Sequence, residues 1–186
     1  MSNFTKNAIK ASFLKLLNER PLSKITIKDI VTDCGINRNS FYYHYQDIPS
    51  LIEEVIKEET DNIISQYPTI SAFEECLKIA VEFALKNKKA VFHVYNSTNR
   101  NIFEHYLWNV CQYVVLTYIN TVFSDYQVVE SDKNVIVKFY KCEIFGQIIW
   151  WLDSGMQHDL LESSQRLCEL RKGMTEELFR RSSDNQ

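Results

Sequence analysis

The side chains with the clearest potential to recognise another molecule are Arg38, Asn39 and Ser40. An arginine can form two hydrogen bonds with a guanine, and an asparagine can form two with an adenine. A polar triplet at the exposed start of a short helix is therefore suited to reading base edges in the major groove of DNA. The alternative is that the triplet is only a group of exposed polar residues after a turn.

Two short helical patterns surround this triplet within residues 25–45. Thr26 can cap the first helix, with Asp29 in the capping-box position. Gly35 is suited to the left-handed conformation that ends the helix. Asn37 can cap the second helix, and Phe41 is its inward-facing residue. The first helix carries an apolar stripe with helical spacing at Ile27, Ile30, Val31 and Cys34. This arrangement predicts a helix-turn-helix.

The segment resembles the DNA-binding domain of the TetR family of bacterial transcriptional regulators. The resemblance runs from about Lys6 to Ile56 and includes the strings T-I-K-D-I-V, C-G-I and F-Y-Y-H-Y. It implies an all-α dimeric protein with a three-helix DNA-binding head and a C-terminal helical effector bundle. The chain departs from the family at Ile48, which Pro49 follows, because the family usually has a lysine there that contacts a DNA phosphate.

The resemblance extends to the residues expected to contact DNA. Arg38, Asn39 and Ser40 match the tip of the family's recognition helix. Candidates for the DNA backbone are Thr26, Lys28, Asn37, Tyr42, Tyr43 and His44. Thr26 also brings the N–H groups of a helix N-terminus toward a phosphate. Tyr42 and His44 can equally pack beside the core residue Phe41.

The charges are distributed unevenly along the chain. Residues 1–47 carry seven Lys/Arg and four Asp/Glu, a net charge of +3, whereas residues 48–186 carry fourteen and twenty, a net charge of −6. Together they give the formal net charge of −3. A weakly basic head on an acidic body suits electrostatic attraction of DNA phosphates to the head.

Other residue types give no sign of catalysis or of a bound cofactor. The five cysteines are widely spaced without a C-x-x-C pair, which predicts reduced thiols in a cytoplasm and no zinc site. The four histidines are scattered, with no H-x-x-x-H pattern. No stretch reaches the ~18 apolar residues that a membrane span needs. We therefore predict a cytoplasmic protein that is not an enzyme.

Helical periodicity continues beyond the motif. We expect a first helix over residues 5–19 and a connecting helix over residues 47–65, which the small head needs for support. The body begins with a capping box at Ser71 and Glu74. Further helices are expected near residue 91 and over residues 102–123, 132–154 and 159–181. The predicted domains are a head at residues 1–47 and a dimerisation and effector body at residues 48–186.

The body carries two candidate binding surfaces. Aromatic side chains could line an effector pocket, although aromatics at helical spacing also form plain core: Phe92, Tyr95, Trp108, Tyr113 and Tyr140. Adjacent helical residues point about 100° apart, so Trp150 and Trp151 cannot both enter one small core. A dimer interface is therefore expected at Trp150, Trp151, Leu160, Leu167 and Met174.

The string GQIIWWLDSGM at residues 146–156 is similar to a TetR subgroup that includes regulators of dihydroxyacetone kinase operons. Some members of this subgroup act as activators through a protein partner. We therefore predict a homodimeric DNA-binding regulator whose head spacing is controlled by a small molecule or a protein. The alternative is a helical ligand-binding or interaction protein in which the helix-turn-helix is only structural.

Overall fold

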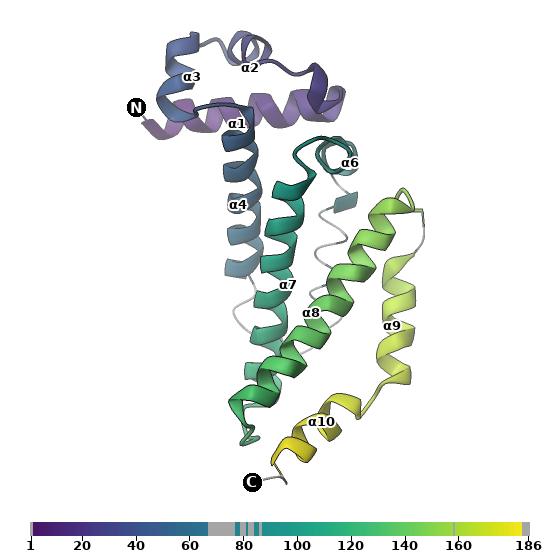
Figure 1. Ribbon diagram of the computed structural model, residues 1–186. Helices are drawn as coiled ribbons and strands as arrows, with labels where there is room; N and C mark the ends of the chain where they lie inside the picture. Colours follow the sequence, from purple (N-terminus) through teal and green to yellow (C-terminus); the bar gives the residue numbers. More distant parts are fainter. Residues whose placement is uncertain are drawn as a thin grey trace. The chain divides into compact units, whose positions relative to one another are not determined.

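All regular structure in the described part of the chain is helical, which confirms the predicted all-α fold (Figure 1). The computed structural model describes residues 2–66, 77–78, 81, 84–85, 87–157 and 159–183. The α-helices are α1 (Ser2–Glu19), α2 (Ile27–Asp33), α3 (Arg38–His44), α4 (Ile48–Gln66), α6 (Lys88–Tyr95), α7 (Arg100–Val122), α8 (Glu130–Asp153), α9 (Leu160–Leu170) and α10 (Met174–Ser183). A short 3-10 helix, η1, spans Leu22–Lys24.

The chain divides into two compact units. The first contains Met1–Asp61 and Lys86–Tyr106, and the second contains Asn62–Leu85 and Leu107–Gln186. The sequence pattern predicts a boundary between head and body after residue 47. The first unit reaches beyond this boundary and includes most of α4, the whole of α6 and the start of α7.

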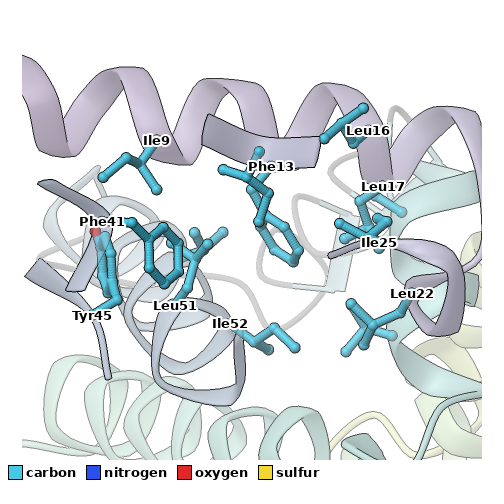
Figure 2. Packing of buried hydrophobic residues seen from close by; sticks show 14 of the residues in the cluster. Ile9, Phe13, Leu16, Leu17, Leu22, Ile25, Phe41, Tyr45, Leu51 and Ile52 are labelled. Atoms are coloured by element: carbon cyan, nitrogen blue, oxygen red, sulfur yellow. The ribbon is translucent and has the colours of Figure 1, made fainter. Parts of the chain in front are cut away.

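The first unit is built around the apolar face of α1, which packs against α2, α3 and α6. Ile9 and Phe13 of α1 point toward Phe41 of α3 and toward Leu51 and Ile52 of α4 (Figure 2). All five side chains are at most 1% exposed. The expectation that the head uses the next helix for support is therefore confirmed.

Helix α6 is held to α1 by a polar contact as well as by apolar packing. Nδ1 of His93 lies 2.6 Å from the carbonyl oxygen of Leu17, near the C-terminal end of α1. Ala90 and Val94 of α6 are buried in the same core. These contacts explain why α6, far from α1 in the sequence, belongs to the first unit.

The second unit is held together around α8. Guanidinium nitrogen Nη1 of Arg171 donates to both carboxylate oxygens of Glu143, at 2.7 and 2.6 Å. The Tyr140 and Thr175 hydroxyls, 2.6 Å apart, join α8 to α10. Phe179 of α10 stacks on the ring of Phe123, with the ring centroids 4.4 Å apart.

The expected single helix over residues 159–181 is wrong. The structure has two helices there, α9 and α10, which are separated at residues 171–173. Gly173 takes φ +84°, the left-handed conformation that ends a helix and that glycine adopts without a steric cost. Arg171, the C-cap residue of α9, is held by Glu143 and adds a tertiary reason for the break. The capping box expected at Ser71 and Glu74 lies outside the described residues.

The fold predicts that Phe41 is essential to the stability of the head. Replacing Phe41 by alanine should cost about 3–5 kcal/mol, because it leaves a cavity in a fully buried site. Tyr43 lies on the same short helix but is 81% exposed, so Tyr43→Ala should change stability by less than about 0.5 kcal/mol. Urea unfolding followed by circular dichroism measures both. Equal effects of the two substitutions would contradict the packing described here.

Candidate nucleic-acid interface

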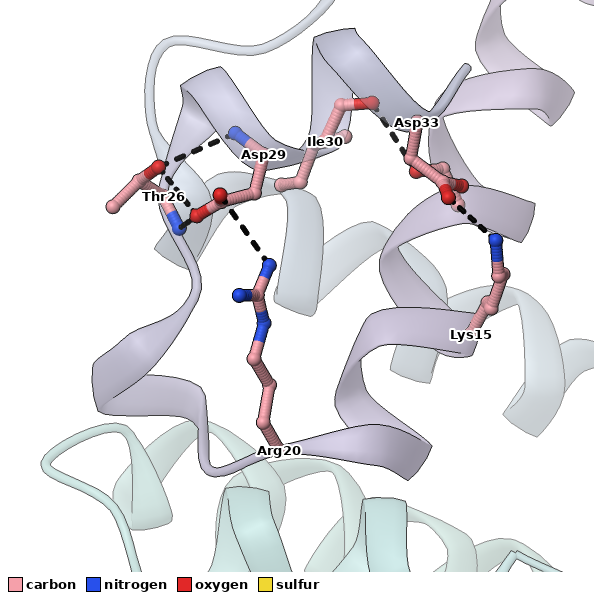
Figure 3. A network of polar contacts seen from close by, with 7 residues as sticks. Lys15, Arg20, Thr26, Asp29, Ile30 and Asp33 are labelled. Atoms are coloured by element: carbon pink, nitrogen blue, oxygen red, sulfur yellow. Dashed lines mark hydrogen bonds and ion pairs between the residues drawn. The ribbon is translucent and has the colours of Figure 1, made fainter.

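The start of α2 is fixed by a reciprocal capping box between Thr26 and Asp29 (Figure 3). The backbone N–H of Asp29 donates to Oγ1 of Thr26 at 3.3 Å, and Oδ2 of Asp29 accepts from the Thr26 N–H at 2.9 Å and from its hydroxyl at 2.6 Å. These bonds from Thr26, together with Arg20, hold the pKa of Asp29 below its ordinary value. The Thr26 hydroxyl is thus engaged within the chain, whereas the neighbouring Lys28 is exposed.

The turn and α3 form as the sequence predicted. Gly35 takes φ +70°. Oδ1 of Asn37 then accepts from the backbone N–H of Ser40 at 2.8 Å and from its hydroxyl at 3.1 Å. Ser40 is half-buried, and its hydroxyl hydrogen is directed to the cap rather than to a base edge. Arg38 and Asn39 are exposed. Among the three predicted base-reading residues, these two present free polar ends.

The aromatic residues that end α3 differ in exposure. Tyr43 is 81% and Tyr42 is 54% exposed, whereas His44 is half-buried. The Tyr42 ring meets the Phe41 ring edge-on with centroids 5.8 Å apart. Tyr42 therefore rests on the core with one edge and offers the rest of its ring and its hydroxyl to solvent. Because His44 is the least exposed of these three residues, a packing role beside the core is best supported for His44.

At the first residue of α4, where the family that the segment resembles usually has a lysine, this chain has an apolar residue. Ile48 is partly buried and packs against the core of the first unit. Asp47 caps the helix, with Oδ1 accepting from the Ser50 N–H at 2.8 Å. A phosphate contact at residue 48 would have to come from the backbone, because an isoleucine side chain has no hydrogen-bond donor.

The seven basic residues within 1–47 fall into two groups. Four are neutralised by carboxylates of the same unit: Lys6, Lys10, Lys15 and Arg20. The other three are exposed and form no ion pair with any residue in the described ranges: Lys24, Lys28 and Arg38. All three lie within the short stretch that contains η1, α2 and the start of α3. The unneutralised positive charge of the head is therefore concentrated at the helix-turn-helix.

Lys24 is a candidate that sequence reasoning missed. It lies in η1, just before the N-terminus of α2, and is exposed. The available signal was its place two residues before the capping residue Thr26. The position of Lys24 does not show from sequence that it lacks an acidic partner, because the acids that pair with the other lysines lie far away in the sequence.

The five residues predicted to line an effector pocket are divided between the two units. Phe92 and Tyr95 belong to the first unit, where Tyr95 is 2% exposed and lies in the core. Trp108, Tyr113 and Tyr140 belong to the second unit. An effector site at these side chains stays a prediction for each unit separately.

The residues predicted for the dimer interface differ in their exposure. Trp151 and Leu160 are 2% and 3% exposed, so they belong to the core of the second unit. Trp150, Leu167 and Met174 are 55%, 37% and 54% exposed. As the sequence argument required, only one of the two adjacent tryptophans enters the core.

Among the described residues, no group of three His, Cys, Asp or Glu side chains could hold a metal ion. None of the described helices is long and apolar enough to cross a membrane.

Comparisons with known proteins find regulators. Residues 12–55 match the family described as "Bacterial regulatory proteins, tetR family", and residues 71–173 match "Transcriptional regulator C-terminal region". The "Uncharacterized HTH-type transcriptional regulator YxbF" of Bacillus subtilis (strain 168) is 26% identical over 163 residues, covering 83% of this chain. The match covers 41% of that relative, so the chain spans about two fifths of its length.

A solved structure, "Dihydroxyacetone kinase operon activator DhaS", has a similar fold, with a TM-score of 0.73. The superposition covers 89% of this chain and 93% of that one, at 17% sequence identity. At this identity the likeness establishes the fold and says nothing about ligand or partner.

The charge distribution predicts which lysines bind DNA phosphates. Lys24→Ala and Lys28→Ala should each weaken binding to random duplex DNA. Each should also make the negative slope of log K against log[salt] shallower by about 0.9, because one phosphate contact fewer releases correspondingly fewer counterions. Lys15→Ala is the control, because Lys15 is already paired with Asp33. Titrations by fluorescence anisotropy at several salt concentrations give the slopes. If Lys15→Ala changes the slope as much as the other two, the assignment is wrong.

Proposed function

The chain belongs to the TetR family of bacterial transcriptional regulators, and from this premise we propose that it binds an operator as a homodimer with two helix-turn-helix heads. Each head would insert α3 into the major groove. The two recognition helices of such a dimer must lie ~34–36 Å apart to enter successive major grooves. Regulation would then consist of changing that spacing.

The observation that carries DNA binding is the concentration of unpaired cations at the helix-turn-helix. Lys24, Lys28 and Arg38 are exposed without a carboxylate partner in the described part of the chain, whereas the remaining basic residues of the head are neutralised. Phosphate contacts supply the sequence-independent part of DNA affinity. A helix-turn-helix with only a structural role would leave this charge pattern without a purpose.

We assign base reading to Arg38 and Asn39, and backbone contacts to the remaining polar residues around them. Both side chains leave α3 at its N-terminal end, which is the end that contacts base edges in this motif. Ser40 would act mainly through the cap that it forms with Asn37. The amide nitrogen of Asn37 and the hydroxyls of Tyr42 and Tyr43 are suitable donors to phosphate oxygens.

The proposal of a homodimer is supported by a second apolar face on α8. Opposite its buried face, exposed residues recur every three or four positions, which places them on one side of the helix: Val135, Phe139, Cys142, Gly146 and Trp150. Exposed apolar side chains continue on α9 and α10 at Leu167, Leu170, Met174 and Leu178. A second copy of this chain would bury these side chains from water, and a stable interface needs at least ~1,200 Å² in total.

The effector can be a small molecule or a protein. Either would act by binding one arrangement of the heads better than another, typically with ~1–3 kcal/mol of coupling. One solved structure with this fold is named an operon activator, so the fold itself does not imply repression.

The base-reading assignment predicts a specific result for Arg38. On a selected operator, Arg38→Ala should cost about 1–3 kcal/mol per half-site and relax the preference at one base pair. Lys28→Ala is the matched comparison, since a lost phosphate contact weakens binding to all sequences alike. Binding to a library of operator variants distinguishes the two patterns. Unchanged affinity and preference in Arg38→Ala would show that α3 does not read bases.

The dimer proposal can be tested at Gly146, at the middle of the exposed face of α8. A Cβ atom there would meet nothing within 4 Å in the single chain, so Gly146→Gln should not harm the fold of one protomer. If a partner helix packs against this position, the larger side chain should dissociate the dimer. Asn134→Gln, an exposed substitution elsewhere on α8, is the control. Sedimentation velocity should show a 22.0 kDa species for Gly146→Gln only. A monomeric parent protein would refute the proposal.

A further inference from the structure

The second unit contains a buried lysine, Lys141, that none of its described carboxylates neutralises. Lys141 is 7% exposed, although a charged side chain is rarely buried without a partner. Its Nζ donates to Oε1 of Gln112 at 2.6 Å and lies 3.9 Å from the centre of the Trp108 ring. Both partners are neutral and lie on α7. No described carboxylate forms an ion pair with this ammonium group.

Two other largely buried cationic side chains of this protein differ from Lys141, because each has an acidic partner. The side chains of Arg171 and Lys10 are 13% and 11% exposed, and each forms an ion pair with a glutamate. Removing an ion from water costs several kcal/mol unless an opposite charge and hydrogen bonds replace the lost hydration. Lys141 has one hydrogen bond and one cation–π contact within the described residues, whereas an ammonium group has three donors.

The neighbouring thiol of Cys111 offers Lys141 no counter-charge. Burial raises the pKa of the Cys111 thiol to about 12, so that group is neutral at physiological pH. Burial also lowers the pKa of Lys141, which is the sign expected where the charged form is poorly solvated. The edge-to-face contact of Trp108 and Phe145, with centroids 5.1 Å apart, adds an aromatic wall. Gln112 itself is exposed, so the hydrogen-bond partner of Lys141 borders solvent.

We propose that Lys141 is the anchor of a binding site for a small organic anion, whose carboxylate or phosphate oxygen contacts the ammonium group beside Gln112 while its apolar part lies against Trp108 and Phe145. An oxyanion would supply the negative charge and the acceptors that the described residues do not. Charge-assisted hydrogen bonds of this kind are roughly twice as strong as neutral ones. That such an anion is the effector rests on the proposed function, whereas its binding does not.

Binding is tested without DNA, so that its failure is distinct from a failure of operator binding. Isothermal titration calorimetry of the full chain with benzoate, inorganic phosphate and the neutral benzamide tests charge recognition. Benzoate or phosphate should bind saturably, at least about tenfold more tightly than benzamide, because a neutral amide cannot neutralise the ammonium. Benzoate alone would indicate a carboxylate ligand with an apolar body, and phosphate alone a phosphorylated one. No binding of either anion, or equal binding of benzamide, would overturn the proposal.

Two variants assign the binding to this residue. Lys141→Met should weaken anion binding at least about tenfold, and Lys138→Met, at an exposed lysine of the same helix, should leave it unchanged. Without anions, Lys141→Met should melt no lower than the parent, because it removes an uncompensated buried charge. Lys141→Gln is the second neutral variant if the methionine variant does not fold. Undiminished binding in a folded neutral variant, or a lower melting temperature in both, would contradict the proposal.

Discussion

The placement of the recognition helix depends on the burial of one side chain, Phe41. Helix α3 has seven residues, whereas isolated helices below about 12–15 residues are marginal in water. Its conformation must therefore come from tertiary packing, which Phe41 provides against α1 and α4, and from the Asn37 cap. Arg38 and Asn39 leave the helix away from this core. In the proposed complex, their direction toward a base edge would thus be set by an apolar contact on the other side of the same helix.

The ion pairs of the head matter more for its electric field than for its stability. Exposed pairs contribute only about 0–1 kcal/mol each, so Lys15–Asp33 and Arg20–Asp29 add little to the free energy of folding. They do neutralise the positive charges of Lys15 and Arg20. The positive electrostatic potential of the head then comes from Lys24, Lys28 and Arg38. A focused positive region raises the rate at which a polyanion associates. The net negative charge of residues 48–186 increases the difference in charge between the head and the rest of the chain.

The parts of this structure that sequence predicted are those governed by near neighbours. The capping box at Thr26, the left-handed Gly35 and the Asn37 cap each depend on residues within four positions, and all three formed. The break between α9 and α10 was missed because a lone glycine costs only about 1 kcal/mol within a helical pattern, and the tie of Arg171 to Glu143 is not visible in local sequence. The contacts of α6 with α1 and the neutralisation of most head lysines are equally long-range.

Helix α8 shows how one sequence pattern can serve three kinds of contact. One face is core, through Ile144, Ile148 and Trp151, and an adjoining edge binds α9 through Glu143. The opposite face is apolar but exposed, and it is the face that the proposed dimer would bury. Lys141 interrupts the buried face at a position where its spacing from Ile144 and Ile148 predicts an apolar residue. If Lys141 anchors an anion as proposed, its buried charge would cost stability in the unliganded unit, and the same residue would favour whichever arrangement lets an anion reach it. A free-energy cost that a ligand relieves in only one of two conformations gives the ligand a higher affinity for that conformation.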